Sequence, residues 1–109
     1  MILFLSGPMT GLPDYNRAEF NRVAALLGAT PNMIVLNPAV LPDGMSHDKY
    51  LHICKAMIDA ADCVAALPGW EISRGANEER DHALAKHTPW FPLINPRPDL
   101  FNNDKEANT

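Results

Sequence analysis

Hydrophobic residues along the chain form short continuous runs separated by longer stretches of helical periodicity. The continuous runs are Ile2–Leu5, Met33–Leu36, Cys63–Leu67 and Trp90–Ile94. A run without polar alternation predicts a strand that is buried on both faces, as strands of parallel sheets are. Pro92 restricts the fourth run to an edge strand or an irregular one, because proline cannot donate a ladder hydrogen bond.

Between these runs, apolar residues recur every three or four positions and predict three helices. The first begins after Asn16, an N-cap with Glu19 as its capping-box partner, and ends at Gly28. The second begins after the N-cap Ser46, and the third covers residues 75–86. Single helices between strands predict right-handed crossovers. We therefore predict a small, doubly wound α/β fold of flavodoxin or Rossmann type, a three-layer sandwich with a four-stranded parallel sheet.

Length and charge limit the domain count and the partners. The 109 residues suffice for one domain, which we assign to residues 1–95, followed by a polar C-terminal tail at 96–109. A net charge of −4 and a pI near 5.4 argue against a nucleic-acid polymer or an anionic membrane as partner. No apolar run approaches the roughly 18 residues that span a bilayer. Cys54 and Cys63 lack metal-ligand spacing, so we expect reduced thiols in a cytoplasmic protein without a metal.

Two glycine-bearing loops follow the first and third predicted strands, at Ser6–Gly11 and Pro68–Gly75. Each loop alone could be a simple turn. In a parallel sheet, however, both lie at the carboxyl edge, where ligands bind at the switch in strand order. The two loops together predict a ligand pocket at this edge.

The start of the third helix combines an anion-binding pattern with an acidic residue. Free N–H groups and the helix macrodipole at Ser73, Arg74 and Gly75 favour a bound anion. Glu79 lies four residues after Gly75, on the small-residue face that should pack against the sheet. A half-buried carboxylate beside an anion site is typical of catalysis. The alternatives are that Ser73 is only an N-cap, that Arg74 pairs with the acidic run, and that Glu79 is a solvated surface residue.

On four segments the chain resembles the nucleoside 2-deoxyribosyltransferase superfamily, and in particular a short, poorly characterised branch from phages and bacteria. These segments are Leu5–Asn16, Asn37–Pro38, Ala61–Trp70 and Ser73–Glu79. The resemblance implies that Glu79 is a nucleophile that attacks the anomeric carbon of a 2′-deoxynucleoside or its 5′-monophosphate. The base leaves, and water or a second base then takes the deoxyribosyl group. No cofactor is implied, and the expected assembly is a homodimer or a higher homo-oligomer in which a partner subunit closes the site.

The resemblance also assigns substrate contacts. Ser73 matches the position that contacts the sugar 5′ end or its phosphate, and we expect Arg74 and Gly75 to bind phosphate with it. A serine there resembles the monophosphate hydrolases. The first loop matches the segment that lines the base and sugar pocket. Its expected pocket residues are Ser6, Gly7, Pro8, Met9 and Gly11, with Asp14 and Tyr15 as either ligand contacts or residues of the turn.

One position departs from the superfamily pattern. Relatives commonly carry an aspartate eight residues before the one that matches Asp62, and this chain has Cys54 there. Loss of a positioned acid or base typically costs about 10²–10⁴-fold in rate. Asp48 and His52, on the same predicted helix, are alternative acids without support from spacing. A nucleotide-binding protein without catalysis therefore remains a second hypothesis.

The remaining conspicuous side chains have ordinary explanations. We interpret His47 as a polar helix position and Glu78 as the helical partner of His82. Trp70 could stack on a base, although packing at a subunit interface is the favoured role.

Overall fold

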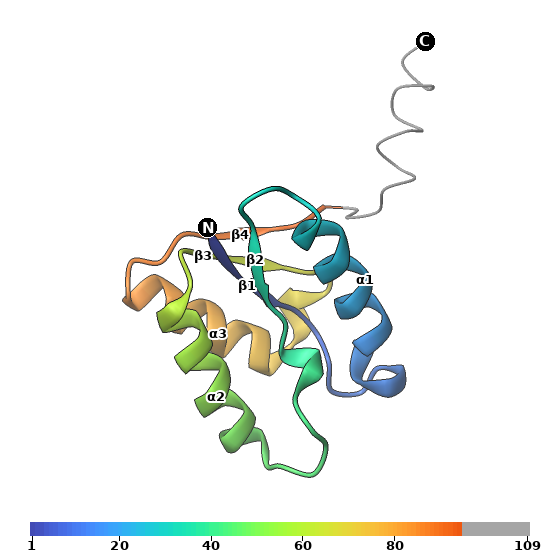
Figure 1. The fold of residues 1–109 in the computed structure, drawn as a ribbon. Helices are drawn as coiled ribbons and strands as arrows, with labels where there is room; N and C mark the ends of the chain where they lie inside the picture. The colour runs from blue at the N-terminus through green and yellow to red at the C-terminus, as the bar shows by residue number, and fades with distance from the viewer. Residues whose placement is uncertain (95–109) are drawn as a thin grey trace.

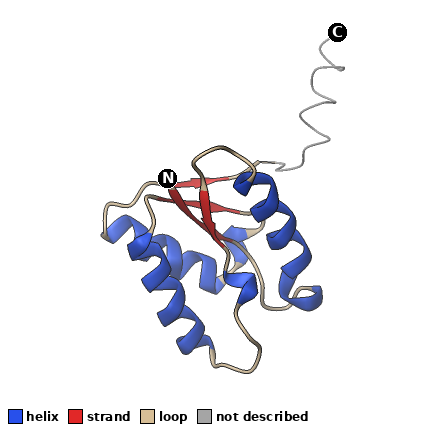
Figure 2. Cartoon of the chain, viewed as in Figure 1, coloured by secondary structure: helices blue, strands red, loops and turns tan. Residues whose placement is uncertain are grey.

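The computed structural model describes residues 1–94, which form one parallel sheet with helices on both faces (Figures 1 and 2). The strands are β1 (Ile2–Ser6), β2 (Ile34–Leu36), β3 (Cys63–Ala66) and β4 (Trp90–Pro92), and the helices are α1 (Arg17–Gly28), α2 (His47–Ala60) and α3 (Arg74–Ala85). Short 3₁₀ turns are η1 (Pro13–Asn16), η2 (Pro38–Val40) and η3 (Trp70–Ile72). The predicted α/β class and four-stranded parallel sheet are confirmed.

The sheet order is β2-β1-β3-β4, with every neighbouring pair parallel. β4 is an edge strand as predicted, but it ends at Pro92 and not at Ile94. None of the helices within residues 1–94 is long and apolar enough to cross a membrane. The predicted tail at 96–109 lies outside the described residues.

Side chains of the central strand β1 alternate between the two faces of the sheet, as the period of a strand requires. Leu3 and Leu5 pack on the α1 face with Phe20, whereas Phe4 packs on the opposite face with Ile58 of α2. Figure 1 shows α1 on one side of the sheet and α2 with α3 on the other. Because both faces are covered, β3 is buried along its whole length and β1 is buried from Leu3 to Ser6, which explains their continuous apolar runs.

The strand order reverses between β1 and β3. The chain moves from β1 to β2 through α1, and it then crosses back through α2 to place β3 on the other side of β1. Just beyond these strands, Gly7 lies so close to Leu67 that a Cβ on Gly7 would be 2.7 Å from the Leu67 Cβ. Only glycine permits this approach. The two loops therefore diverge from one tightly packed point at the switch in strand order.

The start of α1 differs from the prediction. Asn16 occupies the N-cap position, but its Nδ2 donates to the Pro8 carbonyl oxygen at 3.0 Å and its side chain caps no helical N–H. Glu19 pairs with Arg22 and does not close a capping box. Residues 14–16 all have left-handed φ angles of 46–62°, which turns the Asn16 side chain back toward the loop. The predicted capping box is therefore wrong.

Candidate active site around Glu79

The strand β1 and the helices α2 and α3 bring Ser6, Cys54 and Glu79 together at the carboxyl edge of the sheet. Ser6 ends β1 and, by alternation, shares the face of Phe4 that packs against α2 and α3. Its hydroxyl donates to the Glu79 Oε1 at 2.6 Å. The Cys54 thiol of α2 lies beside the same carboxylate, close enough to affect its pKa. Glu79 is only 8% exposed, so the alternative of a solvated surface glutamate is wrong.

Burial controls the protonation of this cluster. Burial raises the pKa of Glu79 to about 7. Interactions with Ser6 and Cys54 lower this pKa, and the charge of Glu78 raises it. Burial also raises the pKa of the Cys54 thiol well above its ordinary value, and the neighbouring Glu79 carboxylate adds to that effect. At neutral pH the thiol is therefore protonated, while the carboxylate divides between its acid and ionised forms.

The Glu79 carboxylate lines a cavity of about 700 Å³, within the size range of small-molecule sites. Its walls come from the loop after β1, the segment that leads into α2, and the first turn of α3. The sequence-predicted residues that line it are Gly7, Met9, Tyr15, Ser73, Arg74, Gly75 and Glu79. Ser6 is fully buried and reaches the cavity through Glu79.

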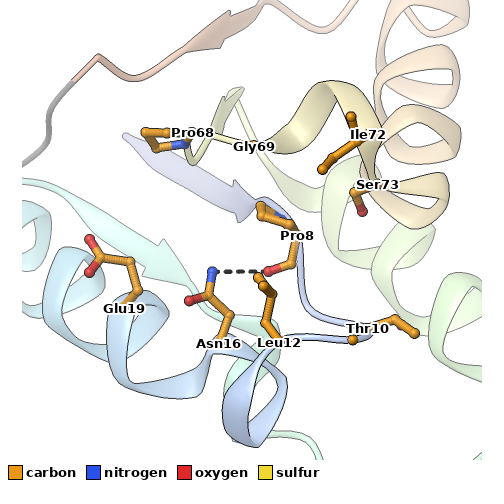
Figure 3. Close-up of a pocket in the computed structure, with 10 residues that line it drawn as sticks. Pro8, Thr10, Leu12, Asn16, Glu19, Pro68, Gly69, Ile72 and Ser73 are labelled. Atoms are coloured by element: carbon orange, nitrogen blue, oxygen red, sulfur yellow. Dashed lines mark hydrogen bonds between the residues drawn. The ribbon is translucent and has the colours of Figure 1, made fainter.

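The other predicted loop residues lie elsewhere. Pro8 and Gly11 line a second hollow of about 630 Å³ on the far side of the first loop, where Asn16 holds the Pro8 carbonyl (Figure 3). Asp14 lines neither hollow, and its carboxylate pairs with Arg17 at 2.6 Å. The residues common to both hollows are Thr10, Ile72 and Ser73. The single pocket predicted for the first loop is thus divided in two.

The first turn of α3 keeps unpaired backbone donors. The Ser73 hydroxyl accepts from the Ala76 N–H at 3.2 Å, so Ser73 is an N-cap. Arg74 Nε donates to Glu78 Oε1 at 2.8 Å. The alternative that Arg74 pairs with the acidic run is therefore correct. Among the described residues, the backbone N–H groups of Arg74 and Gly75 have no acceptor. The positive end of α3 therefore remains open to an anion at the edge of the cavity.

His47 is the residue that sequence reasoning missed. It begins α2, lines the same cavity as Glu79, and places its Nε2 3.2 Å from Glu78 Oε1. The predicted helical pair of Glu78 and His82 is wrong, because His82 bonds Asp59 at 2.7 Å. Helical periodicity reports contacts within one helix and carries no signal for a contact 31 residues apart between α2 and α3.

The other residues considered as acids or stacking groups lie away from the cavity. Asp48 and His52 are exposed and do not line it. Trp70 also lies outside both hollows and packs edge-on against Trp90, with ring centroids 4.6 Å apart. Arg80 lies over both indole rings.

Comparison with known protein families matches residues 1–89 to the family described as "Domain of unknown function (DUF4406)". No curated protein and no solved structure matches the chain. The matched range contains both glycine-bearing loops and all three helices, so the whole cavity lies within the family's domain.

Proposed function

This chain belongs to the DUF4406 family, and we propose that it cleaves the N-glycosidic bond of a 2′-deoxynucleoside or its 5′-monophosphate, or exchanges the base, with Glu79 as nucleophile. The observation that carries this proposal is the buried Glu79 carboxylate, which is held by Ser6 on the wall of a ligand-sized cavity. The resemblance to nucleoside 2-deoxyribosyltransferases supports it independently, because it assigns the nucleophile to the same residue.

The proposed reaction has two steps. The ionised Glu79 carboxylate attacks the anomeric carbon, an ester bond forms, and the electron pair of the glycosidic bond leaves on the base. Water or a second base then attacks the same carbon and releases Glu79. Ser6 donates to Oε1 of the carboxylate. This fixed hydrogen bond orients the group before the substrate arrives, which reduces the entropy cost of the attack.

The start of α3 supports a phosphate at the 5′ end of the substrate. The unpaired N–H groups of Arg74 and Gly75 lie beside the cavity at the positive end of the helix. The Arg74 side chain is 74% exposed and can turn from Glu78 to a bound phosphate with little desolvation. We therefore include the 5′-monophosphate among the proposed substrates.

Two further features belong to the proposal. The cysteines of the described chain, Cys54 and Cys63, are both unpaired, which supports a reducing location such as the cytoplasm. We also propose a homodimer or higher homo-oligomer, from the resemblance alone, and sedimentation velocity measures it directly.

Nucleotide binding without catalysis is the second candidate. Cys54 stands where relatives carry an aspartate, and burial raises the pKa of its thiol. This thiol cannot take the role of a carboxylic acid that assists departure of the base. A cavity that retains the nucleophile but has no proton donor would bind a nucleotide and leave it intact.

Release of free base from a panel of deoxynucleosides and deoxynucleotides, followed by liquid chromatography, separates the two functions. We expect base release that disappears in Glu79→Gln. Glu71→Gln is the matched control, because Glu71 is exposed and lies outside both hollows. Saturable binding without base release in the wild-type protein would support the binding protein, and absence of both would refute both functions.

A further inference from the structure

We infer that His47 is the general acid that protonates the departing base, in place of the aspartate that this chain lacks. The inference rests on the proposed function and names a catalytic residue that neither the sequence pattern nor the resemblance indicated. It follows from the groups that line the cavity and from the partners that each of them already has.

The acidic groups of the cavity are committed elsewhere. Glu79 is the proposed nucleophile, and burial raises the pKa of the Cys54 thiol, which makes that thiol a poor acid. Asp43 lines the cavity, but its carboxylate forms an ion pair with Arg17, which also binds Asp14. The Asp43 side chain is therefore turned to the guanidinium.

The tyrosines are also poor donors. Tyr50 lines the cavity, but its hydroxyl donates to the Pro42 carbonyl oxygen at 2.6 Å. Tyr15 is half-exposed, and the Arg17 guanidinium lies 5.3 Å from the centre of its ring. Among the described residues that line the cavity, the imidazole of His47 is the group suited to this role.

The surroundings of His47 favour proton transfer. Its Nε2 faces Glu78 Oε1 at 3.2 Å, and the same oxygen accepts from Arg74 at 2.8 Å. Burial tends to raise the pKa of Glu78, but the hydrogen bonds with His47 and Arg74 outweigh it and lower that pKa. An ionised Glu78 accepts a hydrogen bond from Nε2 and so orients the ring. Nδ1 has no hydrogen-bond partner within residues 1–94 and is available to the ligand.

His47 lines the same cavity as the nucleophile. Its Cε1 would be 3.6 Å from a Cβ placed on Gly75, so the ring lies beside the first turn of α3. Glu79 lies about one turn further along the same helix. A nucleotide bound in this cavity therefore occupies the space that both side chains line.

The step balances with these two residues. The Glu79 carboxylate forms the bond to the anomeric carbon while the bond from that carbon to the base nitrogen breaks. The electron pair moves to the base, which takes the proton from Nδ1 of His47. Neutral His47 then accepts a proton from the attacking water, which displaces Glu79 and restores both groups.

The test uses the full chain and two substrates that differ in their need for an acid. One is 2′-deoxyguanosine 5′-monophosphate. The other is its 7-methyl derivative, whose base is already cationic and leaves without a proton. We expect His47→Gln to reduce release of guanine by about 10²–10⁴-fold and release of 7-methylguanine by less than about 10-fold. His52→Gln, an exposed histidine on the same helix, is the matched control and should change neither rate.

Each other outcome overturns the inference. An equal loss with both substrates would indicate a structural or binding role for His47, and no loss with either would exclude any role. Retained cleavage of the 7-methyl substrate also demonstrates that the variant is folded. If the wild-type protein cleaves both substrates through Glu79 but His47→Gln is unimpaired, only this inference fails. If the wild-type protein cleaves neither these two substrates nor any other member of the panel, the proposed function fails and the inference fails with it.

Discussion

Replacement of Glu79 by glutamine should stabilise the protein at neutral and alkaline pH. The carboxyl pKa is 4.5 for an unperturbed glutamate and about 7 in the folded protein, mainly because Glu79 is buried. Ionisation of this group therefore opposes folding, and the difference corresponds to roughly 3 kcal/mol when the carboxylate is fully ionised. Glutamine has the same shape, carries no charge, and can still accept the hydrogen bond from Ser6.

The sign of the pH dependence follows from the raised pKa. Below pH 4.5 the glutamate is protonated in both states, and wild type and Glu79→Gln should be similarly stable. Between 4.5 and about 7 the unfolded state releases the proton while the folded state retains it, so the wild type loses stability relative to the variant. Above about pH 7 both states are ionised and the difference levels off.

Urea denaturation at a series of pH values, followed by circular dichroism, measures this difference in the free energy of unfolding. From pH 5 to pH 8 we expect the advantage of Glu79→Gln to grow by roughly 2–3 kcal/mol. Glu71→Gln changes an exposed carboxylate and should give a constant, small difference. Stability curves for wild type and Glu79→Gln that run parallel over this range would refute the claim that burial raises the Glu79 pKa.

Two other predictions concern the residues that hold the site. Ser6→Ala removes the hydrogen bond that lowers the Glu79 pKa, so the rise of base release with pH should move to higher pH. The expected shift is about 1–2 pH units, which corresponds to the free energy of a hydrogen bond to a charged group. An unchanged pH–rate profile would contradict this. Gly7→Ala should destabilise the protein by about 1–3 kcal/mol, because the new Cβ would lie 2.7 Å from the Leu67 Cβ. Gly75→Ala is the comparison, because its new Cβ would be 3.6 Å from the nearest atom, and its melting temperature should equal or exceed that of the wild type. Equal losses of stability in the two variants would refute the packing argument.

The sequence predicts the fold well because a strand that is buried on both faces is apolar at nearly every position. The strands β1 and β3 are covered on each side, and their uninterrupted apolar runs indicate this without any knowledge of the helices. The small residues Ala76 and Ala83 likewise indicate which face of α3 packs inward, and Glu79 shares that face. The apolar runs and the inward face of α3 each depend on a single strand or helix, so the pattern of hydrophobic residues within that element predicts them.

The parts of the site that the sequence does not predict depend on how two elements meet. The contact of His47 with Glu78 is set by the rotation of α2 against α3, which no spacing within either helix encodes. The failed capping box has a similar cause. Asp14, Tyr15 and Asn16 adopt left-handed conformations that are uncommon for residues other than glycine, and tertiary contacts hold them there.

The position of Ser6 at the end of β1 also restricts how this chain can change its length. Phe4 and Ser6 share a face because they are two residues apart, and insertion or deletion of one residue in β1 would exchange the two faces. Such an indel would direct the hydroxyl toward α1 and leave Glu79 without its donor. We expect natural variation in length to be absent from this strand and concentrated in exposed connections outside the cavity, such as residues 28–32.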